Sequence, residues 1–449
     1  MRPLLGATAA VTAVAAAAAA AAGSPLAWSV PPFDPAQPLA GIAPLAGVTA
    51  SVLFWGTPQE GGYNHGAMLH YHDGLLHVAW KNGVNDQGED KTGQRVRIAQ
   101  SADGVTWSGA AVLFPSLNTS AQPVALFAGP FAVLNGRLYA SATPAVIATG
   151  DAQGSQFCLW PDGVDPRNAG PPGQPQPVGT LLLRRVRGAG DFGPVFWARD
   201  TVPAGFGPAS AAAGILTLNE TDAETAGDVA SLSPAMPSLP CGDPATAGTN
   251  KCEAVLHGSQ SYASLPRDAG IANERSHWVV PPGHPTLAGA DVLVYRTHSG
   301  SLLASVRPPG GAWGAAAASP LPNDDSNINA GTLPAGCGGA AFLAANAVPL
   351  RQRNPLTLAL APDGLNFTAV RWLLDCHALA PNSTCVARGP GGSSGGPSYP
   401  QALGVTAPAP APLRGFYVVA TNNKEDVVIA RVPLEDVARA AGATCGGGV

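Results

Sequence analysis

The sequence predicts an all-β protein, a β-propeller of six or seven blades in which each blade is a four-stranded antiparallel sheet. Three observations predict this fold: a composition poor in charge, short strand-length runs, and a recurring turn motif. Only 12% of the 449 residues are charged, whereas 55 are Gly and 45 are Pro. Long helices need Lys, Glu and Gln on their solvated faces, and these are scarce here. The composition therefore favours many turns over long helices.

Runs of strand length, separated by Gly, Pro and Asp, occur along the whole chain. Clear examples are Leu75 to Trp80, Arg95 to Ala99, Arg137 to Ala140, Val292 to Tyr295, Leu356 to Leu360, and Phe416 to Ala420. The best candidate for a helix is Leu434 to Ala441, near the end of the chain. We expect the strand near Val48 to Trp55 to pair with the last blade and close the ring.

A turn motif occurs twice in the same register. Ser101 begins a segment with Asp103, Gly104 and a closing Trp107, and a matching segment runs from Ala361 to Phe367 with Asp363 and Gly364. In such a turn the Asp side chain bonds the backbone, Gly supplies a positive φ, and the aromatic ring packs onto the sheet. Both Asp residues are therefore expected to be structural, in turns that repeat from blade to blade.

The N-terminal residues predict secretion. Arg2 is followed by an Ala-rich apolar run and then by Gly23, Ser24 and Pro25, which is the layout of a cleaved signal peptide. We therefore expect a signal peptide over 1–23, an N-terminal extension over 24–45, the propeller over 46–440 and a flexible tail over 441–449. After cleavage no segment should remain in a membrane. Four Asn-X-Ser/Thr sequons agree with this route and lie at Asn118, Asn219, Asn366 and Asn382.

The cysteines and the net charge limit the partners. In an oxidising compartment the seven cysteines should pair and leave one over. The short separations favour Cys241–Cys252 and Cys376–Cys385 as first pairs. A cysteine metal site would need a close Cys-X-X-Cys spacing, and this sequence has none. A net charge of −5 offers no basic face for nucleic acid, and we expect a monomer that needs no cofactor.

Several segments together resemble the sialidase superfamily. The turn at Asp103 resembles the repeated Asp-box, or BNR, turn of that family, although it is one residue short of the usual spacing. The segment beginning at Tyr63 resembles the opening strand of sialidases, and the segment beginning at Ser398 resembles the closing blade. The resemblance covers most of the chain, from about Tyr63 to Leu434, and it implies a sialidase-like β-propeller.

The resemblance also implies a site at the centre of the ring. Tyr399 matches the nucleophile of the family, and Glu274 matches the glutamate that takes the tyrosine proton. Arg296 and Arg353 match the second and third arginines, which would hold an anionic sugar. The acidic loop 85–90 offers Asp86 or Asp90 as the proton donor, although an acidic loop is also typical of a solvated hairpin tip.

The opening strand departs from the family pattern. Asn64 and His65 stand where sialidases place the first carboxylate-binding arginine. Loss of one guanidinium should weaken a carboxylate clamp, because arginine supplies a fixed bidentate fork. We include Asn64 among the substrate-binding candidates and His65 among the catalytic ones. A histidine on the inner strand also resembles propeller-type polysaccharide lyases and rhamnosidase-like hydrolases.

Three functions therefore stay open at the level of sequence. The favoured one is a secreted sialidase-like exo-glycosidase acting on anionic or deoxy-sugar glycans. The second is a uronate lyase, in which His65 or Tyr399 would move protons and an arginine would neutralise the carboxylate. The third is a propeller that binds glycans without catalysis.

Four histidines lie close together at His65, His70, His72 and His77. On one continuous strand His70 and His72 would face one way, and His65 and His77 the other. Four convergent metal ligands are then excluded, so we favour structural or substrate-facing histidines and expect no metal.

Overall fold

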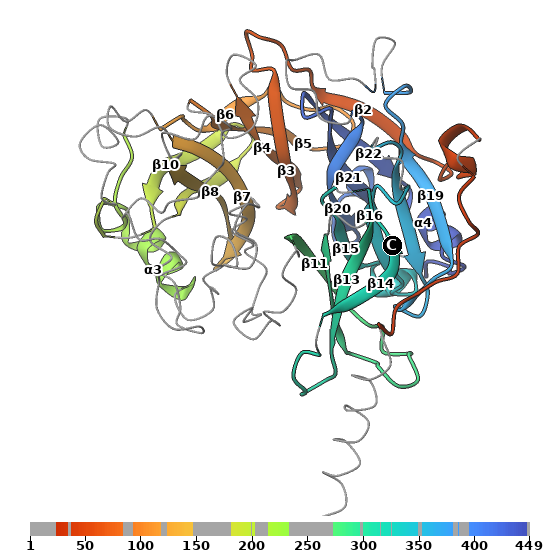
Figure 1. The fold of residues 1–449 in the computed structure, drawn as a ribbon. Helices are drawn as coiled ribbons and strands as arrows, with labels where there is room; N and C mark the ends of the chain where they lie inside the picture. The colour runs from red at the N-terminus through yellow and green to blue at the C-terminus, as the bar shows by residue number, and fades with distance from the viewer. Residues whose placement is uncertain are drawn as a thin grey trace, which may run out of the picture.

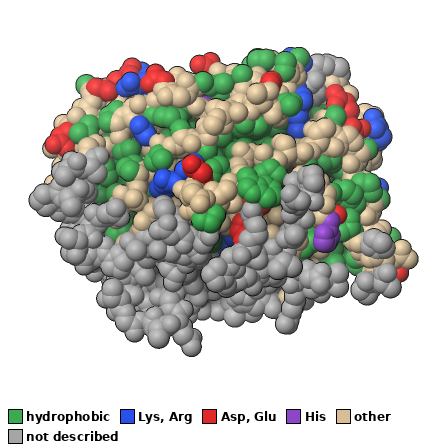
Figure 2. All heavy atoms as spheres, turned by 90° about the horizontal axis from the view of Figure 1, so that it is seen from above, with side chains coloured by type: hydrophobic (Ala, Val, Ile, Leu, Met, Phe, Trp, Pro, Cys, Tyr) green, Lys and Arg blue, Asp and Glu red, His purple; other side chains and the backbone are tan. Residues whose placement is uncertain are grey.

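The computed structural model describes most of the strands that the sequence predicts. The described residues are 24–34, 37–83, 93–117, 124–146, 181–198, 200–202, 214–232, 273–296, 300–314, 316–324, 326–348, 353–379, 385 and 395–446. Within them no helix is long and apolar enough to cross a membrane. On the face shown in Figure 2, charged side chains are sparse among hydrophobic and neutral ones, as the charged fraction of 12% leads one to expect.

The described strands form five four-stranded antiparallel sheets and one short two-stranded sheet. The four-stranded sheets are β3 (Tyr63–His72), β4 (Leu75–Gly83), β5 (Arg95–Ser101) and β6 (Ala111–Phe114); β7 (Val124–Leu134), β8 (Arg137–Val146), β9 (Leu182–Gly188) and β10 (Asp191–Trp197); β11 (Asn273–Val279), β12 (Asp291–Arg296), β13 (Ser301–Arg307) and β14 (Ala317–Pro322); β15 (Asn329–Thr332), β16 (Ala341–Ala345), β17 (Leu356–Ala361) and β19 (Ala369–Leu374); and β20 (Pro397–Val405), β21 (Gly415–Asn422), β22 (Asp426–Val432) and β2 (Thr49–Phe54). The remaining elements are β1 (Ala27–Trp28), β18 (Asn366–Phe367), α3 (Ala223–Leu232), α4 (Leu434–Ala440), and the short 3-10 turns η1 (Pro38–Gly41), η4 (Leu218–Glu220), η7 (Ala335–Cys337) and η8 (Ala411–Leu413).

The first strands of the sheets face one another around a common centre, which is the arrangement of a β-propeller (Figure 1). Strand β3 contacts β7 on one side and β20 on the other, and β15 contacts β20 and β11. The all-β prediction and the four-stranded antiparallel blades are confirmed. Five four-stranded sheets lie in the described part, and much of the chain between β10 and β11 lies outside it, so the number of six or seven blades stays a prediction.

The ring is closed by the N-terminal strand. Strand β2 pairs antiparallel with β22, so that Thr49 lies opposite Arg431 and Phe54 opposite Val427. This pairing confirms the predicted closure, and it supplies the outermost strand of a sheet whose other three strands come from the end of the chain. The predicted C-terminal helix is also present as α4.

The two Asp-Gly turns are structural, as predicted. Oδ1 of Asp103 accepts hydrogen bonds from the backbone N–H groups of Val105 and Thr106, at 2.8 and 2.7 Å. These two bonds lower the pKa of Asp103 to about 2, and the bond from Thr106 has the larger effect. Asp363 makes the same pair of bonds to the two residues that follow Gly364, at 2.9 and 2.7 Å. The first turn connects β5 to β6, and the second connects β17 to β18. Each carboxylate accepts hydrogen bonds from the backbone of its own turn.

The interpretation of the four histidines as one continuous strand is wrong. A turn at Asp73 and Gly74 separates β3 from β4, so His70 and His77 lie opposite each other in the ladder. Both rings pack against Phe131 of β7, with ring centroids 5.8 and 5.9 Å away. The pair therefore belongs to the interface between two neighbouring sheets. Nδ1 of His77 lies 3.1 Å from the side-chain amide of Gln100.

This histidine pair predicts a loss of stability in acid. Burial is the main cause that lowers the pKa of His70 and of His77 to about 4, from 6.5 in the unfolded chain. Between pH 6.5 and 4 the unfolded state therefore binds more protons than the folded state, so stability is complete above pH 6.5 and falls as pH drops to 4. Each histidine contributes up to roughly 3 kcal/mol of this loss.

Replacing His70 by Leu should flatten this dependence, measured as the urea midpoint at a series of pH values between 7 and 4. His284, in the loop between β11 and β12, supplies the control. His284→Gln should keep the dependence of the urea midpoint on pH that the parent protein shows. An unchanged slope in His70→Leu would show that other groups cause the acid sensitivity.

Candidate active site

Tyr399 lies in a strained part of the first strand of its sheet. The pairing of β20 with β21 shifts between Ser398 and Gln401, which places Tyr399 in a β-bulge. Its φ is +60°, a left-handed conformation that costs a residue with a side chain about 1 kcal/mol or more. Its side chain is buried, with 3% of its surface exposed. Such strain is typical of functional positions, and here it directs the ring inward.

Three cationic side chains from three sheets surround the ring of Tyr399. Arg296, at the end of β12, donates a hydrogen bond from Nη1 to the tyrosine hydroxyl at 3.1 Å. The guanidinium carbons of Arg296 and Arg353 lie 5.9 and 5.4 Å from the ring centroid, and Nζ of Lys424 lies 5.3 Å from it. Both arginines are buried, with 6% and 8% of their surfaces exposed. Two guanidinium groups and one ammonium group therefore lie around one phenol ring.

His65 reaches the same tyrosine from a fourth sheet. Its ring meets that of Tyr399 edge-on, with centroids 4.0 Å apart and an interplanar angle of 73°. A bulge between His65 and Met68 in β3 turns the strand at this point. The structure thus brings together four of the residues singled out from the sequence, although they are up to 334 positions apart: Tyr399, Arg296, Arg353 and His65. Their chemical roles stay predictions.

Asn64 is used entirely by the protein. Its amide nitrogen donates to the carbonyl oxygens of Gly61 and Glu425, at 3.0 and 2.5 Å. Its amide oxygen accepts from the indole of Trp80 and the side chain of Asn82, at 2.9 and 2.8 Å. A carboxamide has two donors and two acceptor positions, so none is left for a ligand. This geometry favours a positioning role for Asn64 over the substrate contact expected from the sequence.

The predicted carboxylates are not placed by the structure. The backbone of Glu274 lies in β11, whose first residue, Asn273, pairs with Arg296, but its side chain is outside the described part. Asp86 and Asp90 also lie outside the described residues. The pairing of Tyr399 with a carboxylate therefore stays a prediction.

The backbone of Arg353 is held in a similarly strained form, with a φ of +46°. Its N–H donates to Oδ2 of Asp324 at 3.0 Å, and its carbonyl accepts from the amide of Asn346 at 2.8 Å. The same amide nitrogen lies 3.0 Å from the carbonyl of Pro397, two residues before Tyr399. Asn346 therefore connects the arginine segment to the tyrosine segment.

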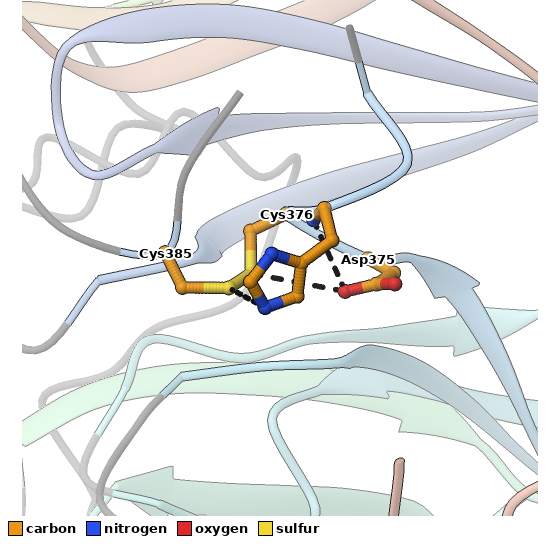
Figure 3. A group of neighbouring side chains, drawn as sticks. Asp375, Cys376 and Cys385 are labelled. Carbon is orange, nitrogen blue, oxygen red and sulfur yellow. Dashed lines mark hydrogen bonds between the residues drawn. A yellow bond between two sulfur atoms is a disulfide. The ribbon is translucent and has the colours of Figure 1, made fainter. Parts of the chain in front are cut away.

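A disulfide joins Cys376 to Cys385, next to Asp375 (Figure 3). Cys376 and Cys385 are bonded, which confirms the predicted pair; Cys241 and Cys252 lie outside the described residues. The side chain of Asn354, next to Arg353, accepts from the N–H of Cys376 and donates to Asp375, both at 3.0 Å. The bridge thus anchors the loop that follows β19 against the arginine segment.

Four potential ligand atoms gather around the same disulfide. Within the described part, the group of metal-ligating side chains consists of Asp375, Cys376, His377 and Cys385, and Nε2 of His377 lies 3.0 Å from the sulfur of Cys385. A cysteine binds a metal through its thiolate, and neither Cys376 nor Cys385 has a thiolate because the two sulfurs form a disulfide. We therefore interpret the group as a structural cross-link.

Lys424 is the site residue that reasoning from the sequence missed. It lies in the tight turn between β21 and β22, beside Asn423. A lysine at a hairpin tip is ordinarily solvated, so neither its type nor its spacing predicts a place in the centre of the ring.

The fold is similar to that of solved sialidases. A protein described as a sialidase matches with a TM-score of 0.61 and 17% identity, over 91% of this chain and 35% of that protein. This chain therefore spans about a third of its length. A mutant NanB sialidase from Streptococcus pneumoniae matches with a TM-score of 0.47 and 10% identity, over 86% of this chain and 71% of the other. A leech intramolecular trans-sialidase matches with a TM-score of 0.48 and 10% identity, over 87% of this chain and 71% of the other.

No family model and no curated protein matches the sequence. The likeness therefore lies in the arrangement of the sheets, which agrees with the closing strand β2 and with the Asp-Gly turns found in two of them. From these observations the chain has the sialidase-like β-propeller fold.

Proposed function

We propose that this protein is a secreted glycoside hydrolase, a sialidase-like exo-glycosidase that removes anionic or deoxy sugars from glycans. The observation that carries the proposal is the surroundings of Tyr399, whose hydroxyl accepts a hydrogen bond from Arg296 and whose ring lies close to Arg353 and Lys424. Arginine and lysine side chains can bind an anionic sugar, and a tyrosine nucleophile needs an oriented hydroxyl.

In the proposed mechanism Tyr399 attacks the anomeric carbon while Glu274 takes its proton. Asp86 or Asp90 donates a proton to the leaving oxygen, and water later cleaves the sugar–tyrosine bond. Arg353 holds the anionic group of the sugar, and Arg296 fixes the direction of the tyrosine hydroxyl. Secretion is supported by the signal-like N-terminus and by the disulfides Cys376–Cys385 and Cys337–Cys445.

The second candidate is a uronate lyase on the same scaffold. The observation that favours it is the edge contact of His65 with Tyr399, because a histidine and a tyrosine side by side can serve as base and acid for elimination. A binding propeller without catalysis is the remaining alternative.

Digestion of a glycan panel separates these functions. The panel contains sialyl oligosaccharides, uronate polysaccharides and neutral oligosaccharides without aryl groups, and both released sugar and ultraviolet absorbance are measured. We expect release of an acidic sugar without a rise in absorbance. A rise would indicate elimination, since only a lyase makes a conjugated product, and binding without turnover would indicate the third function.

A further inference from the structure

The connection between β14 and β15 carries polar side chains into the interior of the protein. It leads from the last strand of one sheet to the first strand of the neighbouring sheet. Asn323 and Ser326 are completely buried, and Asp324 has only 5% of its surface exposed. Burying a carboxylate or an amide is costly unless partners inside the protein replace water. The side-chain oxygens of this connection therefore need donors or a cation.

Hydrogen bonds bring Asn346, the residue that follows β16, against this connection. The N–H of Asp324 donates to the carbonyl of Asn346 at 2.8 Å, and Oδ2 of Asp324 accepts from the N–H of Arg353 at 3.0 Å. The side chain of Asn323 turns back into the connection, where its Nδ2 donates to the carbonyl of Ser326 at 2.9 Å. Polar side chains from two separate segments thus gather at one place.

Three buried oxygens at this place have no hydrogen-bond partner in the described part of the chain. They are Oδ1 of Asn323, Oγ of Ser326 and Oδ1 of Asn346, and each belongs to a side chain with at most 1% of its surface exposed. The orientation of the Asn346 amide is fixed, because its Nδ2 lies within 3.1 Å of three backbone carbonyl oxygens. A buried acceptor without a partner destabilises the fold, so three of them together point to a bound species.

We infer that this place is a structural calcium site, in which the oxygens of Asn323, Ser326 and Asn346 bind the ion together with the carboxylate of Asp324. Calcium takes about six to eight oxygen ligands in a flexible geometry, and amide and backbone carbonyls are among them. Magnesium demands a stricter octahedron and keeps several waters. A single carboxylate among neutral ligands predicts weak binding, with a Kd on the order of 0.1–1 mM.

The ion supports the two segments that carry Arg353 and Tyr399. Asp324 bonds the backbone of Arg353, and the amide of Asn346 bonds the carbonyl of Pro397, two residues before Tyr399. The site lies outside the two groups considered above for metal binding, the histidines of β3 and β4 and the side chains around the Cys376–Cys385 disulfide. The inference does not depend on hydrolysis, because a propeller that only binds glycans could hold the same ion.

The test is a thermal-shift titration of the full chain with calcium after treatment with a chelator, and with magnesium as the comparison. Saturating calcium should raise the thermal midpoint of the parent protein by roughly 3 °C, and magnesium should raise it less. Asp324→Asn should weaken calcium binding at least about tenfold, because it removes the charge and keeps an oxygen for the N–H of Arg353. Ser326→Ala should weaken it roughly threefold. Asp375→Asn, in the group around the disulfide, is the matched control and should bind calcium like the parent.

A fourth variant separates a bound cation from ordered water. Asn323→Asp adds a charged ligand but removes the amide donor that bonds Ser326. It should therefore be less stable than the parent in chelator, and it should bind calcium at least about threefold more tightly, which a misfolded variant would not do. The inference is overturned if the parent shows no calcium-dependent shift, if Asp324→Asn and Ser326→Ala keep the affinity of the parent, or if Asn323→Asp binds no more tightly. An equal shift with magnesium would overturn the assignment to calcium.

Discussion

Replacement of Tyr399 by Phe should lower kcat at least about a thousandfold and leave the thermal midpoint nearly unchanged. The change removes one oxygen atom, whose hydrogen bond comes from Arg296. The ring keeps its edge contact with His65 and its place beside the arginines, so the packing of the pocket is preserved. The loss should therefore appear in kcat, measured on the substrate that the glycan panel identifies.

A second tyrosine provides a matched control. Tyr417 is fully buried in the same sheet, and its hydroxyl donates to the carbonyl of Leu413 at 3.0 Å. Tyr417→Phe should cost about 1 kcal/mol of stability, the typical value of one hydrogen bond, and keep full activity. Full activity in Tyr399→Phe would show that another group is the nucleophile or moves the proton, and His65 would be the next residue to test.

The parts of the fold predicted correctly are those with local causes. An Asp-Gly turn forms because one carboxylate satisfies two N–H groups within three residues, so Asp103 and Asp363 could be interpreted from the sequence alone. The same holds for the short loop closed by Cys376 and Cys385. Closure by β2 is not local, but a propeller needs a partner for its last edge, and the first strand was available.

One error had a local cause, because the four histidines were treated as one strand although Asp73 and Gly74 form a turn just before the strand run that begins at Leu75. The other errors have non-local causes. Lys424 was missed because its place depends on Asn64, which lies 360 positions earlier and fixes the turn through a hydrogen bond. Asn64 itself was expected to bind substrate because it stands where the sialidase pattern has an arginine, and the sequence does not show that its amide is used by Gly61, Trp80, Asn82 and Glu425.

The disulfide between Cys337 and Cys445 was not predicted either, because the separation of 108 residues gives no local signal. The tail expected to be flexible is tied at Cys445 to the short turn η7. The N–H of Gly446 also donates to the carbonyl of Gly336 at 2.7 Å. The bridge covers a core in which Cys337 is fully buried beside Val437 of α4.

Removing this bridge should cause the largest loss of stability among the changes considered. Closing a loop of this length restricts the unfolded chain, and this loss of entropy raises the free energy of unfolding by ~4–5 kcal/mol. The short Cys376–Cys385 loop raises the free energy of unfolding by roughly 2–3 kcal/mol. The double variant Cys337→Ala/Cys445→Ala should therefore lose more stability in denaturant titrations than Cys376→Ala/Cys385→Ala.

The effects of the two double variants on the site should have the opposite order. The short bridge adjoins Arg353 through Asn354, so its loss should raise KM, while the long bridge packs against α4 and its loss should leave KM unchanged in the folded protein. Equal stabilities of the two variants would show that the unfolded chain is already restricted near residue 445, and the entropic account of the long bridge would then be wrong.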